Sequence, residues 1–195
     1  MTRQSPLVRR TLAGIHRVHG NPVHRKQPLT PNDLLQVAHC FPDPIDYDDL
    51  LFKTLLFVGF DQLLHLGKLC PPYDPRLYNV HHSLKCYEVC LSPSVVRLLL
   101  LGHKGNKFFE GSTLQFSCST DPISPFCPFH QYLSLRDQCF RWLPKLWLLS
   151  TGVPPTHSWF LSRFRRHFPT SILGHSMRTG GATVLALAGV PDERI

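Results

Sequence analysis

The sequence predicts an α+β fold that is mainly helical and contains a small antiparallel β-sheet. Three observations predict it. Ser5 and Thr30 are each followed by proline, the pattern of a helix cap and a first helical position. Residues 80–118 are rich in β-forming or continuous apolar residues and are interrupted by glycine and asparagine. The regions on either side have apolar residues at helical spacing rather than in strict alternation.

The first predicted helix begins at the Ser5 cap and ends at Gly20, a residue type that commonly terminates helices. Its apolar residues form one stripe, and its basic residues extend a positively charged surface. These basic residues are Arg9, Arg10, Arg17 and His19. The polar stretch 21–27, which contains proline, then predicts a linker.

Two more helices are predicted before the sheet. A short helix should begin at Thr30 and end near Cys40, because two prolines follow it closely. A longer helical region should run from Asp46 to Gly67, with a bend at Gly59 and a stop at Gly67.

The sheet is predicted in the middle third of the chain. Strands are expected over 80–91, 95–101 and 112–118. Glycines and an asparagine within 102–111 favour a turn between the last two strands. Lys104 would lie on the tightest connection of that hairpin.

The remaining elements are predicted to be mostly helical. One helix follows a proline-rich stretch and carries Phe129 and Tyr132 on its apolar face, and another covers 156–167. Residues 142–150 fit either a short strand or a buried turn. The last helix opens around His175.

The composition indicates a polyanionic partner. The 195-residue chain has a formal net charge of +8 and twelve histidines. DNA or RNA fits this charge better than an acidic protein does, although a soluble protein that is basic for other reasons has the same composition. The first ten residues are polar and basic, unlike a signal peptide, and no apolar run reaches membrane-spanning length. We expect an intracellular protein with no membrane partner.

The seven cysteines do not define a secreted disulfide framework, since their number is odd and their spacing is unpaired. Cys86 and Cys90 could suggest zinc together with nearby histidines, as could Cys127 with His130, but no second pair has zinc-finger spacing. We expect buried free thiols, no metal and no cofactor.

The most informative motif is GHSMRTGGAT, at residues 174–183. His175 and Arg178 are three positions apart, so in a helix they share one turn and point the same way. A helix N-terminus favours an anion there, and arginine offers a planar fork for phosphate oxygens. Taken alone, the pair also fits an exposed basic helix start.

The residues around this motif, 158–195, closely resemble the second catalytic box of the tyrosine recombinase (phage integrase) family. The resemblance is greatest to transposon-derived DNA breaking-rejoining proteins of mushroom-forming fungi. It continues, in the family's order, through SPLVRRTLAGIHRVHG at 5–20, LLFVGFDQLLHLGKL at 55–69 and SPSVVRLLLLGHKGNKFFEG at 92–111. It therefore covers nearly the whole chain.

The resemblance implies a division of the chain into parts. Residues 1–20 would be the last helix of a core-binding domain, which clamps DNA, and 21–29 would be a linker. Residues 30–195 would form a tyrosine recombinase catalytic domain that is truncated at its C-terminus.

The family's chemistry implies roles for the matching residues. A tyrosine attacks the scissile phosphate without metal, and two arginines stabilise the extra negative charge of the transition state. Arg178 matches the second arginine and His175 the histidine of the box. Lys104 matches a turn lysine that protonates the leaving oxygen. Without the flanking match Lys104 would be an ordinary hairpin lysine, and Lys107 competes for the role.

The first clamp arginine is replaced in this chain. Where the family reads close to LLRLGEL, this sequence reads LLHLGKL, with His65 in the arginine position and Lys68 in a usually acidic one. An imidazole cannot reproduce the bidentate contact of a guanidinium. The alternative is that His65 packs beside Leu64 and Leu66 and has no such role.

The nucleophile is the second departure from the family pattern. The five tyrosines, at positions 47, 73, 78, 87 and 132, all precede the second box, and the sequence ends at Ile195. We therefore expect a DNA recombination and integration protein that is inactive as this chain stands. The alternative is a non-catalytic DNA-binding or structural remnant of a transposon integrase.

Double-stranded DNA is the expected partner, bound in the nucleus, with a homo-oligomer on the DNA as one form and no small-molecule substrate. Phosphate contacts are expected from basic residues outside the catalytic set. These are Arg9, Arg10, Arg17, Lys107, Arg163, Arg165 and Arg166. The aromatic residues that alternate with the last three arginines fit the core better than they fit base stacking.

Overall fold

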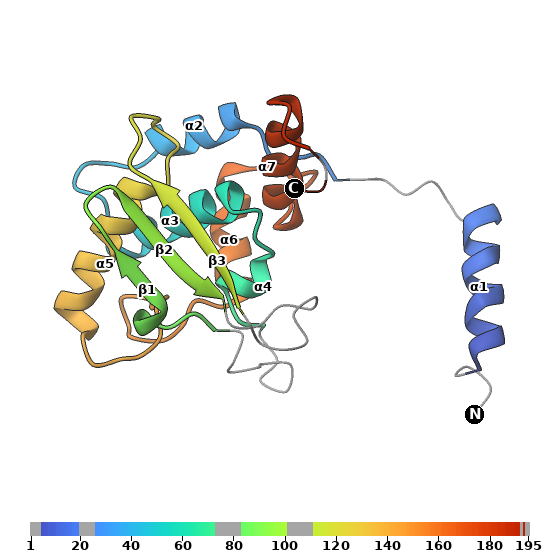
Figure 1. The fold of residues 1–195 in the computed structure, drawn as a ribbon, viewed down its shortest axis with the longest axis horizontal. Coiled ribbons are helices and arrows are strands. Elements are labelled where there is room, and N and C mark those ends of the chain that lie inside the picture. Colours follow the sequence, from blue (N-terminus) through green and yellow to red (C-terminus); the bar gives the residue numbers. More distant parts are fainter. Residues whose placement is uncertain (1–4, 20–25, 73–82, 101–110, 192, 194–195) are drawn as a thin grey trace.

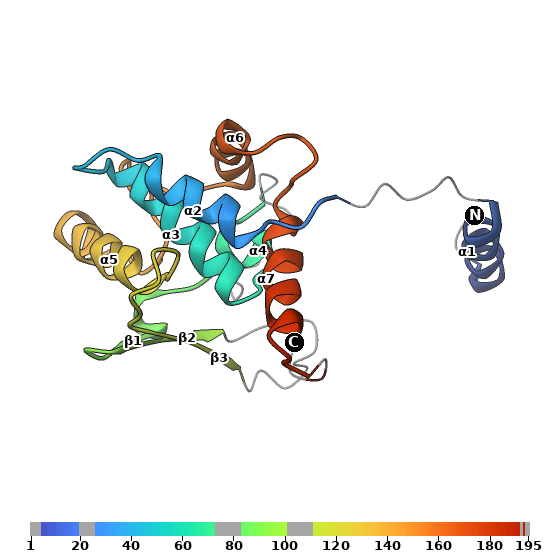
Figure 2. The same cartoon turned by 90° about the horizontal axis from the view of Figure 1, so that it is seen from above.

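The structure, a computed structural model, describes residues 5–19, 26–72, 83–100, 111–191 and 193 (Figure 1). Its elements in chain order are α1 (Pro6–His19), α2 (Pro31–His39), α3 (Tyr47–Asp61), α4 (Leu66–Leu69), the 3₁₀ turn η4 (Cys86–Glu88), β1 (Val89–Leu91), β2 (Val95–Leu100), β3 (Ser112–Ser117), α5 (Phe126–Phe140), α6 (His157–His167) and α7 (His175–Leu187). The predicted fold class, helices with one small antiparallel sheet, is confirmed. Helix α1 lies apart from the other elements in both views (Figures 1 and 2).

The helix starts follow local capping chemistry. At α2 the Thr30 hydroxyl accepts a hydrogen bond from the Asp33 amide (3.2 Å), and the Asp33 carboxylate accepts one from the Thr30 amide (2.8 Å). The side chains of Asp46 and Thr156 cap α3 and α6 in a related way. The predicted starts of α1, α2, α3 and α6 are thus confirmed.

Helix α3 is the centre of the fold. From Leu50 to Phe60 every residue is buried except half-buried Lys53, so the helix is enclosed on all sides. It packs against α5 and α7, with the sheet on one side and α6 on the other (Figure 2). No helix among the described residues is long and apolar enough to cross a membrane.

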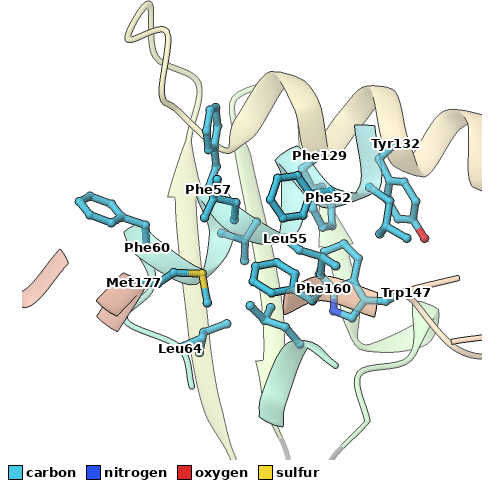
Figure 3. Packing of buried hydrophobic residues seen from close by; sticks show 14 of the residues in the cluster. Phe52, Leu55, Phe57, Phe60, Leu64, Phe129, Tyr132, Trp147, Phe160 and Met177 are labelled. Carbon is cyan, nitrogen blue, oxygen red and sulfur yellow. The ribbon is translucent and has the colours of Figure 1, made fainter. Parts of the chain in front are cut away.

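The core joins α3 to the other helices through large side chains (Figure 3). Phe52 contacts Phe160 of α6 with ring centroids 5.2 Å apart, and Phe129 of α5 meets Trp147 edge-on at 5.8 Å. Met177 of α7 is fully buried in the same cluster. The first turn of α7 is therefore anchored to the core that surrounds α3.

The sheet has the order β1-β2-β3, with both pairs antiparallel. In β2 the residues alternate, so Val96, Leu98 and Leu100 are buried while the residues between them are exposed. Leu100 pairs with Ser112, so β2 and β3 are the two arms of the predicted hairpin. The connection between them, which carries Lys104 and Lys107, lies outside the described residues.

The long helix predicted from Asp46 to Gly67 is interrupted at residues 62–65. Helix α3 ends at Asp61, the next turn contains Leu63 with a φ of 53°, and Gly67 lies inside the separate helix α4. Gly59 does not bend the helix. A Cβ there would lie 2.8 Å from Leu69 Cδ1, so Gly59 instead allows α4 to approach α3 closely.

Two other predicted segments also differ. The strand expected over 80–91 is short where it is described, because residues 86–88 form η4 before β1 begins. Residues 142–150 form no strand beyond an isolated bridge between Lys145 and Lys85. Residues 146–148 make a buried connection instead, since the Tyr132 hydroxyl donates to the Leu146 carbonyl (3.0 Å) and accepts from the Leu148 amide (2.8 Å).

Candidate DNA phosphate site

His65 lies at the junction of α3 and α4. The chain turns there because the Leu64 amide donates to the Gly59 carbonyl (2.9 Å), closing α3, and Leu64 is buried. The His65 carbonyl then accepts from the Lys68 amide (2.8 Å) at the start of α4. The flanking contacts thus hold the backbone while the His65 side chain is exposed.

The first turn of α7 is fixed by Ser176. Its amide donates to the Leu173 carbonyl (2.8 Å), its hydroxyl accepts from the Leu173 amide (3.0 Å), and its carbonyl accepts from the Leu29 amide (3.0 Å). With Ser176 and Met177 buried, exposed His175 and half-buried Arg178 lie on the outer side of the turn.

The glycine pair of the motif positions α7 against the core. A Cβ at Gly180 would lie 2.0 Å from the Leu29 carbonyl oxygen, and a Cβ at Gly181 would lie 2.2 Å from the Phe60 carbonyl oxygen. Only glycine permits both approaches. The pair therefore brings the start of α7 close to the end of α3, and hence close to His65.

His65, His175 and Arg178 come together at this junction. Arg178 Nη1 contacts His65 Nε2, although the two residues are 113 positions apart in the sequence. The rings of His65 and His175 stack with centroids 5.8 Å apart and planes 15° apart. Of the four residues expected to be catalytic, His65 thus contacts both His175 and Arg178, and the fourth, Lys104, lies outside the described residues.

The cluster of His65, His175 and Arg178 carries positive charge or can acquire it. Lys68 follows on α4, and burial lowers the pKa of its ammonium group. Within the described part of the chain, no ion pair joins Arg178 or His175 to a carboxylate. An anion such as a phosphate group would therefore find an arginine fork and two imidazoles on one exposed surface.

Among the arginines of α6, Arg163 is held by contacts within the protein. Arg163 forms an ion pair with Asp49, lies 3.8 Å from Asp48 Oδ2, and places its guanidinium 4.9 Å from the centre of the Trp159 ring. The charge of Arg163 therefore joins α6 to the start of α3, which leaves less of it for the DNA contact predicted from the sequence.

The other basic residues are placed as follows. Arg165 and Arg166 are exposed on α6, and Arg10 is exposed on α1. The side chains of Arg9 and Arg17, and all of Lys107, lie outside the described residues. The aromatic residues of α6 belong mainly to the core, since Phe160 and Phe164 are fully buried.

We expect Arg163→Ala to lower the free energy of unfolding by about 1–2 kcal/mol, because it removes a partly buried ion pair and a cation–π contact. Arg165→Ala, two positions further along the same helix but exposed, is the matched control and should change it by less than about 0.5 kcal/mol. Urea unfolding followed by circular dichroism measures both. Equal stabilities of the two variants would contradict the structural role of Arg163.

Three of the five tyrosines can be placed. Tyr132 is fully buried, and burial raises the pKa of its hydroxyl. Tyr47 packs against it with ring centroids 5.7 Å apart and planes tilted by 58°, while Tyr87 is 70% exposed on η4. Tyr132 and Tyr47 are therefore core residues. Among the described residues no group of three or more potential metal ligands was found.

Sequence reasoning missed two features that position the site. The hydrogen bond from the Leu29 amide to the Ser176 carbonyl and the close approach of Gly180 to Leu29 both depend on the segment before α2, which packs beside α7. The available signal was the run of small residues after Arg178, since small residues in a helix mark a close approach of another chain segment.

Comparison with known proteins supports the fold. No family model matches the sequence, and no curated protein matches it significantly. Among solved structures, the XerH site-specific recombinase bound to a palindromic difH substrate aligns with a TM-score of 0.57 and 14% identity, over 90% of this chain and 46% of that one. The Tn1549 transposon integrase in complex with circular intermediate DNA aligns with a TM-score of 0.54 and 15% identity, over 92% and 59%.

The class of fold follows from these alignments. Both neighbours are recombinases or integrases, and this chain spans about half the length of each. Its helices and small antiparallel sheet are those of the tyrosine recombinase catalytic domain.

Proposed function

We propose that this protein belongs to the tyrosine recombinase family, binds double-stranded DNA and takes part in DNA recombination or integration. The observation that carries the proposal is the convergence of His65, His175 and Arg178 on one exposed surface of a catalytic-domain fold. The net charge of +8 is also suited to a polyanionic partner.

The chemistry proposed for the cluster is electrostatic. In the family reaction a tyrosine hydroxyl attacks phosphorus, the tyrosyl–phosphate bond forms, and the bond to the 5′ oxygen breaks. Extra negative charge then develops on the non-bridging oxygens. Arg178 would hold these oxygens with its fork and His175 would donate one hydrogen bond, while Lys104 would give a proton to the leaving 5′ oxygen.

His65 favours a second candidate function, DNA binding without efficient strand exchange. The histidine stands where the family has an arginine, and it contacts Arg178 instead of offering a second guanidinium. Loss of one oxyanion donor commonly lowers a rate on the order of a hundredfold to a thousandfold. A protein with this site would still bind phosphate, because binding depends mainly on positive charge.

The proposal extends to assembly and location. A transposon-derived protein acting on chromosomal DNA would be nuclear, and a palindromic duplex offers two equal half-sites to two copies. Sedimentation of the protein on a palindromic duplex should therefore give complexes with two or more copies. Complexes with one copy at every protein concentration would contradict the oligomeric part of the proposal.

DNA binding should be sensitive to salt. We expect affinity for a duplex of about 20 base pairs to fall steeply between about 50 and 200 mM salt. Arg178→Ala should reduce the slope of log affinity against log salt by about one, because one phosphate contact is lost. Fluorescence anisotropy with a labelled duplex measures both.

Arg163→Ala is the matched control, because Arg163 is already ion-paired with the start of α3. Its salt slope should equal that of the unmodified protein. An affinity independent of salt, or an equal slope for Arg178→Ala and the unmodified protein, would contradict the phosphate site.

A further inference from the structure

The contact between His65 and Arg178 determines the protonation of the imidazole. A guanidinium has only donors and stays charged at all relevant pH values. Nε2 of His65, which contacts Nη1 of Arg178, must therefore act as the acceptor. An imidazole with a free lone pair on Nε2 is neutral and carries its proton on Nδ1.

This contact uses a part of Arg178 that a phosphate group would need. The guanidinium binds oxyanions through paired N–H groups of its planar fork. With one terminal nitrogen directed at His65, the fork is partly occupied. His65 is thus a competitor of phosphate for Arg178 and not an additional donor to it.

We propose that His65 caps Arg178, so that a phosphate oxygen has to displace the neutral imidazole before Arg178 can bind it. This inference rests on the proposed function, because it concerns access to the same phosphate site. It assigns the family's arginine position a new role in this chain, that of a residue that limits anion binding.

The position of His65 allows such a displacement. Its side chain is exposed, and the backbone hydrogen bonds of the junction involve its carbonyl and its neighbours. The imidazole lies against His175 by stacking, with planes 15° apart. A rotation about the side-chain bonds would move the ring away from Arg178 without unfolding α4.

Basic groups adjoin His65 from two elements. His175 and Arg178 face it from α7, and Lys68 follows it on α4. Protonation of His65 would place an N–H against the guanidinium N–H, so the cap would open and a second cation would face the anion. Acid should therefore strengthen anion binding through His65. Residues 101–110 lie outside the described part of the chain.

The proposed cap predicts that removing the His65 side chain strengthens phosphate binding. At pH 8, where the cap is closed, His65→Ala should raise the affinity for inorganic phosphate by on the order of tenfold, the effect of removing one hydrogen bond to a charged group. At a pH low enough to protonate His65 the gain should vanish or reverse, since the unmodified protein then offers a charged imidazole. If His65 were only a weak donor, His65→Ala would weaken phosphate binding at both pH values, and that result would overturn the cap.

A double-mutant cycle isolates the pair. In an Arg178→Met protein, His65→Ala should leave the phosphate affinity at pH 8 unchanged, because no guanidinium remains to be capped. The same tenfold gain in the Arg178→Met background would contradict the inference. Because position 65 is exposed, unchanged thermal unfolding of His65→Ala provides the check on folding.

A second readout does not depend on phosphate. Long-range ¹H–¹⁵N spectra of the full chain at pH 8 should show His65 protonated on Nδ1 and bare on Nε2, and a proton on Nε2 would overturn the cap outright. Failure of the proposed function and failure of the cap give different results. If Arg178→Met binds phosphate and DNA as the unmodified protein does, the proposed function fails. If Arg178→Met weakens binding and His65→Ala does so too, only the cap fails.

Discussion

Gly180→Ala is expected to lower the free energy of unfolding by about 3 kcal/mol or more, or to prevent folding. The added methyl group would lie 2.0 Å from the Leu29 carbonyl oxygen and 2.9 Å from a ring carbon of Phe60. Backbone cannot yield as a flexible side chain does, so α7 would have to move away. That movement would also break the hydrogen bond from the Leu29 amide to the Ser176 carbonyl.

Gly67→Ala is the matched control for this experiment. Gly67 lies in α4, and the nearest atom to its added methyl group would be His157 Nε2 at 3.8 Å, an ordinary contact distance. Its unfolding free energy should change by less than about 1 kcal/mol. Urea unfolding of both variants measures the difference, and a Gly180→Ala protein as stable as Gly67→Ala would show that α7 does not pack on the 27–30 segment as described.

His65→Arg is expected to have the largest effect on catalysis. In a polypeptide where a family C-terminal segment supplies the tyrosine, the substitution should accelerate covalent adduct formation on a nicked suicide duplex by about a hundredfold to a thousandfold. It supplies the missing fork and removes the imidazole that contacts Arg178. Denaturing gels of protein–DNA adducts against time measure the rate.

His65→Lys distinguishes the effect of the planar guanidinium from the effect of positive charge alone. Lysine carries the same charge at a single point, so it should give a much smaller acceleration than arginine. An arginine variant that is no faster, in a protein still dependent on Arg178, would remove His65 from the arginine position.

The helix starts could be predicted because capping is a local property of the sequence. Thr30 and Asp33 form their capping box within one turn, and Asp46 and Thr156 act on amides of their own helices. The ends were less predictable. Gly67 has the residue type of a helix stop, yet α3 ended earlier, where the turn at Leu63 is held by tertiary packing.

The candidate site was predictable only through the family's motif order. Nothing local connects His65 with Arg178, which lie 113 positions apart. The ion pairs of Arg163 could not be predicted for a similar reason, because its acidic partners lie far away in the sequence, at the start of α3. The imidazole–guanidinium contact could not be predicted at all, because the motif indicates that two residues meet but not which of them accepts.

The central claim is that His175 and Arg178 hold a DNA phosphate, and a side-chain NMR titration tests it most directly. The ¹H–¹⁵N signals of the Arg178 guanidinium and the His175 imidazole are followed while a duplex of about 20 base pairs is added to saturation. We predict that both signals shift in proportion to the bound fraction and return when salt releases the DNA. Signals of Arg178 and His175 that stay in place at saturation, while those of exposed Arg165 and Arg166 move, would contradict the account.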